Sequence, residues 1–205
     1  MATEVEFPRY RSFKIILIGN AGVGKTSLIQ RYSEGYFHDS SLHKVLKHDF
    51  VEKDVLIDRS LYRFVVWDTA GQEKYKSVTR SLYHNVDGVI FVYDVTNTSS
   101  YVDLKSWLGE IRDYLEPLPN TCIFLANKCD RDVSEQLVTF SQLKNDPDFS
   151  EFMYKYETSA LTGDNVGVVF DTLQREIVKK RGGDIDRKYQ EIANKHEYTP
   201  PSCAC

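Results

Sequence analysis

Residues 19–26 carry the most restrictive pattern in this chain, G-x-x-x-x-G-K-T. An apolar run precedes the pattern at residues 13–18, and residues 27–32 have helical character. A strand, a glycine-rich loop and a helix thus follow one another. The glycines let consecutive backbone N–H groups turn toward an anion, and the helix adds the positive end of its dipole. The pattern therefore predicts a phosphate-binding loop rather than a simple turn between a strand and a helix.

Two side chains of this loop add chemistry to the backbone. Lys25 supplies a charge that can reach the β- and γ-phosphates of a nucleotide, and the Thr26 hydroxyl can ligate a magnesium ion. The nucleotide-binding residues that this segment predicts are Asn20, Ala21, Gly22, Val23, Gly24, Lys25, Thr26 and Ser27.

The composition is that of a folded domain. With 205 residues, of which 41% are hydrophobic, we expect one domain plus tails. A net charge of −4 argues against a nucleic-acid binder held mainly by bulk charge. We expect neither a transmembrane helix nor a signal peptide, because no apolar run has the required length. Cys122 and Cys129 are expected to be reduced thiols of a cytosolic chain, with Cys122 buried.

Strand-like runs alternate with helix-like stretches along the chain. Strands are predicted at 13–18, 50–57, 62–67, 88–93, 121–126 and 154–157, a hairpin turn at 58–60, and helices at 26–33, 100–115, 140–144 and 166–180. This alternation predicts an α/β fold with a mostly parallel sheet. Because ligands of such sheets bind beyond the carboxyl ends of the strands, the chemistry is expected in the loops that follow them.

Three further motifs follow strand-like runs. Residues 67–73 read W-D-T-A-G-Q-E, residues 127–130 read N-K-C-D and residues 157–161 read E-T-S-A-L. On these motifs, on Y-D-V-T-N at 93–97, and on Trp107, the chain resembles a Ras-superfamily small GTPase of the Rab family over about residues 13–180. The resemblance implies a P-loop NTPase fold with a six-stranded, mostly parallel sheet and about five helices. It also implies bound GTP or GDP and slow intrinsic GTP hydrolysis.

The resemblance assigns catalytic and metal-binding roles. Asp68 is a carboxylate at a strand end and is suited, with Thr26, to hold Mg²⁺. Gly71 can bring its N–H to the γ-phosphate, and Gln72 is implied to orient the attacking water, as in related GTPases. The implied catalytic residues are therefore Gln72, Lys25 and Gly71.

The N-K-C-D motif predicts the choice of base. Asn127, Lys128 and Asp130 match the base-reading motif of the family. The Asp130 carboxylate can accept two hydrogen bonds from the N1 and N2 groups of guanine, and adenine offers no such pair. This motif therefore favours GTP and argues against the alternative that the chain is an ATP-using P-loop enzyme.

One further loop and one aromatic residue are expected near the base. Ser159 and Ala160 resemble the S-A-K loop of the family, in which the alanine N–H contacts the base oxygen, although Leu161 replaces the usual lysine. A backbone contact should survive that replacement. Phe37 corresponds to an aromatic residue on the base edge, but a core phenylalanine explains it nearly as well.

The first switch segment departs from the family. Its usual threonine joins the magnesium shell when GTP is bound. Residues 39–50 contain no threonine, and counting from the two ends of the segment places Lys44 or Val45 at that position. Ser40 or Ser41 could substitute only along another loop path. A ligand shifts an equilibrium only by its differential contacts with two states, so we expect weak ordering with GTP.

The chain ends in a C-x-C pattern that resembles the Rab prenylation signal. A C-a-a-X box is absent because Ser202 stands fourth from the end. The resemblance implies geranylgeranylation of Cys203 and Cys205, and two lipid chains anchor a protein stably where one is marginal. A free-thiol tail is the alternative.

These features imply an organisation and a function. We expect an N-terminal extension at 1–11, a small GTPase domain at 12–181 and a flexible tail at 182–205. The implied protein is a monomeric GTPase of vesicular traffic on the cytosolic face of intracellular membranes, with a cytosolic pool when bound to an escort or inhibitor. Its implied partners are an exchange factor, a GTPase-activating protein, a GDP-dissociation inhibitor and the Rab escort and geranylgeranyl transferase machinery, with no nucleic acid. The alternative is a membrane-anchored nucleotide-binding interaction module with weak or no turnover. The missing threonine favours this alternative, and Gly71 and Gln72 oppose it.

Overall fold

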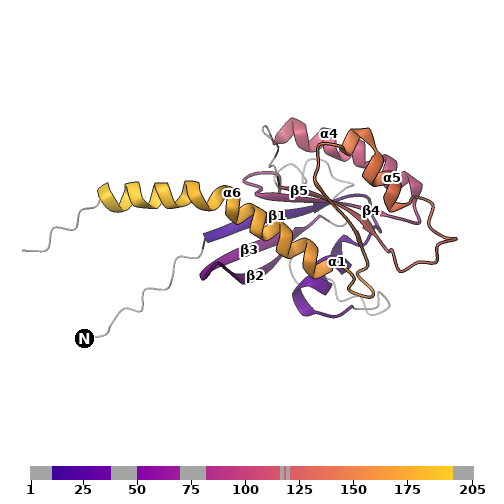
Figure 1. The fold of residues 1–205 in the computed structure, drawn as a ribbon, viewed down its shortest axis with the longest axis horizontal. Coiled ribbons are helices and arrows are strands. Elements are labelled where there is room, and N and C mark those ends of the chain that lie inside the picture. The colour runs from indigo at the N-terminus through magenta and orange to yellow at the C-terminus, as the bar shows by residue number, and fades with distance from the viewer. Residues whose placement is uncertain (1–10, 38–49, 70–81, 116–117, 119–120, 196–205) are drawn as a thin grey trace, which may run out of the picture.

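A single six-stranded sheet forms the centre of the molecule (Figure 1). The computed structural model describes residues 11–37, 50–69, 82–115, 118 and 121–195, and the side chains of residues 12–181 among them. The strands are β1 (Arg11–Ile18), β2 (Phe50–Ile57), β3 (Ser60–Asp68), β4 (Gly88–Asp94), β5 (Cys122–Asn127) and β6 (Tyr154–Thr158). Their order is β2-β3-β1-β4-β5-β6, and of the described pairs only β2–β3 is antiparallel. The predicted mostly parallel α/β sheet is therefore confirmed.

Helices cover both faces of the sheet (Figure 1). The described helices are α1 (Lys25–Glu34), α3 (Thr98–Val102), α4 (Leu104–Tyr114), α5 (Phe140–Asn145), the 3₁₀ turn η2 (Pro147–Phe149) and α6 (Val166–Lys195). One core cluster lies between the sheet and helices α1 and α6, and a second lies between the sheet and helices α4 and α5. Within the described ranges, no helix combines the length and the hydrophobicity that crossing a bilayer requires.

The side-chain pattern of the strands follows their position in the sheet. In β1, Ile15 and Leu17 enter the first core cluster, whereas Ile16 and Ile18 enter the second. The central strands β4 and β5 are buried along their whole length. This burial agrees with their near-continuous apolar sequences, which are typical of strands covered on both faces. These buried central strands fix the strand ends on which the candidate site is built.

The predicted hairpin is confirmed between β2 and β3. Asp58 and Arg59 have φ values of 49° and 68°, the left-handed conformation that two-residue hairpin loops require. The turn is one residue shorter than predicted, because Ser60 already pairs with Ile57 as the first residue of β3.

Two helices differ from their predicted bounds. The helix predicted at 100–115 is divided at Asp103, which keeps a right-handed helical conformation between α3 and α4. The last helix, predicted to end at 180, continues through Gly182 and Gly183 to Lys195, so residues 182–195 of the predicted tail are helical (Figure 1). Glycine within a helix costs only about 1 kcal/mol relative to alanine, so two glycines weaken a helix without ending it.

Candidate functional site

The phosphate-binding loop connects the end of β1 to the start of α1, as its pattern predicts. Gly24 has a φ of 100°, and a Cβ atom placed on it would lie 2.4 Å from the Asn127 Nδ2. A Cβ atom on Gly19 would lie 2.1 Å from the carbonyl oxygen of Val92. The two glycines of the motif are therefore required by close neighbours from β4 and β5.

We expect Gly24→Ala to lower the free energy of unfolding by about 2 kcal/mol or more, because the new Cβ atom both strains the backbone and displaces Asn127. Gly22→Ala is the matched control: Gly22 also has a positive φ, 78°, but no atom of the described residues outside its chain neighbours lies within 4 Å of a Cβ atom there. Its expected cost is strain alone, about 1 kcal/mol. Urea denaturation of the two variants measures the difference, and equal losses would contradict the steric role of Gly24.

The Lys25 side chain is buried against the phosphate-binding loop. Its side chain is 2% exposed, and its Nζ donates hydrogen bonds to the carbonyl oxygens of Gly19 at 2.8 Å and Asn20 at 2.9 Å. The ammonium group is thus held by two consecutive carbonyl groups at the start of the loop. A buried positive charge at this place is suited to offset the charge of a bound phosphate.

Thr26 and Asp68 meet beside the loop. The Thr26 hydroxyl donates to the Asp68 Oδ2 at 2.5 Å, and the sheet register sets Asp68, at the end of β3, opposite Leu17 of β1. A hydroxyl and a carboxylate are hard oxygen donors, and Mg²⁺ takes one or two carboxylates while water and nucleotide phosphates complete its octahedron. The described residues contain no cluster of three or more His, Cys, Asp or Glu side chains that would hold a metal ion by themselves. The residues therefore fit a magnesium ion shared with a nucleotide.

Asn127 joins the phosphate-binding loop to the ends of two strands. Its side chain is 1% exposed, and its Nδ2 donates to the carbonyl oxygen of Val23 at 2.8 Å. Its Oδ1 accepts a hydrogen bond from the Thr158 hydroxyl at 3.2 Å. The first residue of the base-reading motif thus connects the phosphate loop to the ends of β5 and β6.

Lys128 forms an ion pair with Asp94, to which the sequence motifs assigned no role. Its Nζ lies 2.6 Å from the Asp94 Oδ2 at the end of β4, and its φ of 66° is left-handed. Burial acts to raise the pKa of Asp94, but hydrogen bonds from Lys128 and Thr96 outweigh it, so the pKa lies below its usual range. Asp94 stands in the Y-D-V-T-N segment, which carried only the family resemblance, so no local signal indicated this role.

Asp130 is oriented by the last of the predicted loops. The Ser159 hydroxyl donates to the Asp130 Oδ1 at 2.5 Å and accepts a hydrogen bond from the Thr162 N–H at 3.1 Å. Ala160 is buried beside it, whereas the Leu161 side chain is 53% exposed. The structure therefore brings Asp130, Ser159 and Ala160 together, with the unusual Leu161 side chain turned to the surface.

Asn20 is tied to α4 by a further pair that sequence reasoning missed. The Asn20 Nδ2 donates to the Asp103 Oδ2 at 2.6 Å, and the Trp107 Nε1 donates to the Asn20 Oδ1 at 2.8 Å. Trp107 was noted only for the family resemblance. These bonds fix the amide of a phosphate-loop residue from a helix more than eighty positions away in the chain.

The remaining predicted residues divide into described and undescribed positions. Ala21 and Gly22 are exposed on the loop, and Ser27 lies in the first turn of α1. Phe37 packs against the first core cluster, in line with the core alternative, and its place on the base edge stays a prediction. The predicted positions outside the described residues are Ser40, Ser41, Lys44, Val45, Gly71, Gln72, Cys203 and Cys205.

Neither internal cysteine forms a disulfide with another described residue; Cys122 is buried and Cys129 is half-buried. Burial is the main cause that raises the pKa of Cys129 to about 11. The thiol inside the N-K-C-D motif is therefore neutral at physiological pH and adds no charge between Lys128 and Asp130.

The sheet order and these strand-end loops define a P-loop nucleotide-binding protein. The Ras family model matches residues 14–179. The chain is 38% identical over 175 residues to Ras-related protein Rab-4A of Homo sapiens. This match covers 85% of this chain and 78% of the human protein. It is 37% identical over 175 residues to Ras-related protein Rab-26 of Drosophila melanogaster, covering 82% and 43% of the two chains. It is 35% identical over 171 residues to Ras-related protein RabG2 of Dictyostelium discoideum, covering 83% and 85%. The chain belongs to the Ras superfamily and, within it, to the Rab family of small GTPases.

Proposed function

We propose that this Rab-family GTPase binds GTP or GDP with Mg²⁺ at the described strand ends and hydrolyses GTP slowly while lipid-anchored to an intracellular membrane. The observation that carries the proposal is the contact of Thr26 with Asp68 at 2.5 Å beside the buried ammonium of Lys25. This arrangement supplies a positive charge and two hard oxygen donors next to a loop of backbone N–H groups.

The phosphate half of the site rests on groups that are already in place. Lys25 would donate to the β- and γ-phosphates from its position among the loop carbonyls, at the start of α1. Thr26 and Asp68 would hold Mg²⁺, which supplies charge neutralisation when bound. Since these groups are preorganised, little rearrangement opposes binding.

The base half of the site rests on Asp130. Its carboxylate is fixed by the Ser159 hydroxyl through one oxygen and would accept hydrogen bonds from N1 and N2 of guanine. Lys128, anchored on Asp94, would lie along the base face. Ala160 would offer its N–H to the base oxygen.

Hydrolysis would depend on residues outside the described part of the chain. Gln72 would orient water, Gly71 would approach the γ-phosphate, and an arginine from a GTPase-activating protein would act in trans. The tail would carry geranylgeranyl groups on Cys203 and Cys205, added by the escort and transferase machinery. A GDP-dissociation inhibitor would keep a cytosolic pool, and an exchange factor would reload the monomer on the cytosolic face of the membrane.

One observation favours a second function, a nucleotide-binding interaction module without appreciable turnover. Residues 39–50 lack the threonine that couples the first switch to the γ-phosphate. Without that hydroxyl, GTP and GDP would differ less in the contacts they make with this loop.

Single-turnover hydrolysis of bound GTP separates the two functions. We expect a wild-type rate on the order of 10⁻⁴ s⁻¹ without an activating protein, and a rate about 10-fold lower for Gln72→Leu with unchanged GTP affinity. Gln142→Leu, which changes only the capping box with Thr139 at the start of α5, should leave the rate unchanged. No detectable wild-type turnover, even with a matching activating protein, would favour the interaction module.

A further inference from the structure

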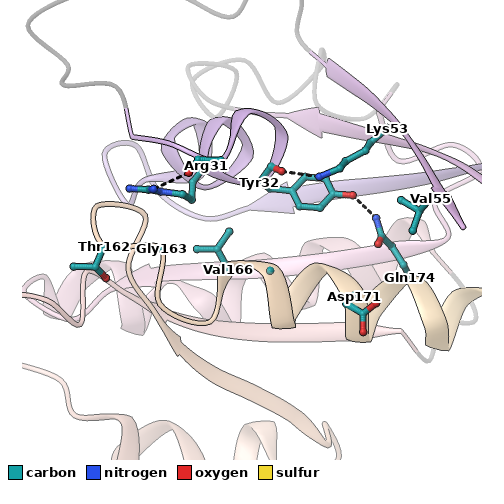
Figure 2. A pocket seen from close by; sticks show the side chains of 11 residues that line it. Arg31, Tyr32, Lys53, Val55, Thr162, Gly163, Val166, Asp171 and Gln174 are labelled. Atoms are coloured by element: carbon teal, nitrogen blue, oxygen red, sulfur yellow. Dashed lines mark hydrogen bonds between the residues drawn. The ribbon is translucent and has the colours of Figure 1, made fainter. Parts of the chain in front are cut away.

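Arg31, in the last turn of α1, holds the loop that follows β6. Its Nε donates to the carbonyl oxygen of Ala160 at 2.8 Å, and its Nη2 donates to the carbonyl oxygen of Leu161. Its Nη1 donates to the carbonyl oxygen of Gly35 at 3.0 Å, just after the helix. Figure 2 shows the Arg31 side chain extending from α1 over the loop that carries Thr162 and Gly163. One guanidinium thus joins the end of α1 to two consecutive carbonyls of the Ser159–Leu161 loop.

The backbone is held on both sides of the Ala160 N–H group. The carbonyls of Ala160 and Leu161 hold it on the C-terminal side, and Ser159 holds it on the N-terminal side. The Ser159 N–H donates to the carbonyl oxygen of Asp164 at 3.2 Å, and the Ser159 carbonyl oxygen accepts from the Gly163 N–H at 2.8 Å. The Ser159 hydroxyl is bound to Asp130. The Ala160 N–H therefore lies between a residue fixed by its own loop and carbonyls fixed by Arg31.

Arg31 is suited to this task by its shape and its charge. A guanidinium presents several N–H donors in a rigid planar fork, so it can hold two neighbouring carbonyls at once, and it stays charged at every physiological pH. Arg31 also packs against this loop: a Cβ atom on Gly163 would lie 3.7 Å from the Arg31 Cδ and Nε, an ordinary van der Waals contact. The exposed Leu161 side chain offers the loop no polar tether of its own.

We propose that Arg31 is a positioning residue for guanine recognition, holding Ala160 so that its N–H meets the O6 atom of the base. The inference rests on the proposed function, namely that the chain binds a guanine nucleotide with its base at this loop. Because α1 begins with Lys25 and Thr26, the same rigid helix then sets the phosphate contacts at one end and the O6 contact at the other.

The test compares three nucleotides that differ in the groups on the base. GDP has both O6 and the 2-amino group, and inosine diphosphate lacks the 2-amino group. The diphosphate of 2-aminopurine riboside lacks O6 and also the proton on N1, but the loss of the N1 contact with Asp130 is the same in every variant, so a change in preference between variants reports on O6. Dissociation constants are measured for the wild-type protein and for Arg31→Ala, Arg31→Lys and Arg175→Ala. Arg175 is exposed on α6 and pairs with Asp171, so it is the matched control for losing an arginine.

In Arg31→Ala we expect the preference for GDP over the 2-aminopurine nucleotide to fall by about 10-fold, because the Ala160 N–H is no longer held in place. The preference for GDP over inosine diphosphate, which Asp130 reads, should stay unchanged. Arg31→Lys should lie between wild type and Arg31→Ala, since one ammonium group cannot hold both carbonyls in the same geometry. Arg175→Ala should match wild type.

A uniform weakening of all three nucleotides, with both preferences unchanged, would overturn the inference and leave Arg31 a purely structural residue. If Arg31→Ala does not fold, as judged by its thermal melt, the Arg31→Lys preference decides in the same way. A wild-type protein that fails to bind GDP would overturn the proposed function and this inference with it, whereas wild-type binding with unchanged preferences overturns this inference alone.

Discussion

Asp130→Asn is expected to lower the affinity for GDP by roughly 100-fold or more and to raise the affinity for xanthosine diphosphate. The wild-type carboxylate can accept hydrogen bonds from both N1 and N2 of guanine, and hydrogen bonds to a charged group contribute about 1.5–3 kcal/mol each. An asparagine amide keeps one acceptor and adds an N–H donor, which suits the 2-oxo group of xanthine. The Ser159 hydroxyl, which lies 2.5 Å from the Asp130 Oδ1, can still donate to the amide oxygen, so the side chain stays oriented.

Competition between fluorescent GDP and unlabelled GDP, ATP or xanthosine diphosphate measures this change. Asp132→Asn is the matched control, because Asp132 is an exposed neighbour with the same charge. Its affinities should equal those of the wild-type protein. An Asp130→Asn protein that still prefers GDP would remove Asp130 from base recognition and reopen the choice between guanine and adenine nucleotides.

Lys25→Met is expected to lower the affinity for GDP and GTP by about 100-fold or more, through loss of a charged donor to the phosphates. Methionine keeps much of the side-chain volume inside the loop. The carbonyl oxygens of Gly19 and Asn20 lose the donor that lies 2.8 and 2.9 Å away, so the nucleotide-free protein should also lose about 1–3 kcal/mol of unfolding free energy.

Isothermal titration with GDP and urea denaturation of the nucleotide-free protein measure the two effects separately. Lys105→Met, an exposed substitution on α4, loses the same charge away from the loop and should leave nucleotide affinity unchanged. A Lys25→Met protein that is destabilised but binds GDP normally would show that Lys25 only supports the loop.

Most of the fold followed from short-range patterns. The six strands and the β2–β3 hairpin were predicted close to their observed bounds, since apolar runs and a polar turn report directly on local backbone preference. The C-terminal helix was the main error, because the helix predicted at 166–180 continues through Gly182 and Gly183 to Lys195. A glycine pair lowers helix stability but does not by itself set a boundary.

The sequence by itself determined which groups are expected to meet the ligand. The spacing of Gly19, Gly24, Lys25 and Thr26, with Asp68, Asn127 and Asp130 after later strands, predicts phosphate, magnesium and guanine, because each contact belongs to a short segment with its own chemistry.

Only the tertiary structure decided how these groups are held. Arg31 bonds Ala160 across 129 positions of the chain, and Asn127 bonds Val23 across 104. Such pairs leave no periodic or local signal, since they exist only where the order β1-β4-β5-β6 brings separate strand ends to one edge of the sheet. The glycine loop therefore indicates that a phosphate binds here, and the side chains from distant elements determine how rigidly the loop and the base-reading residues are set around it.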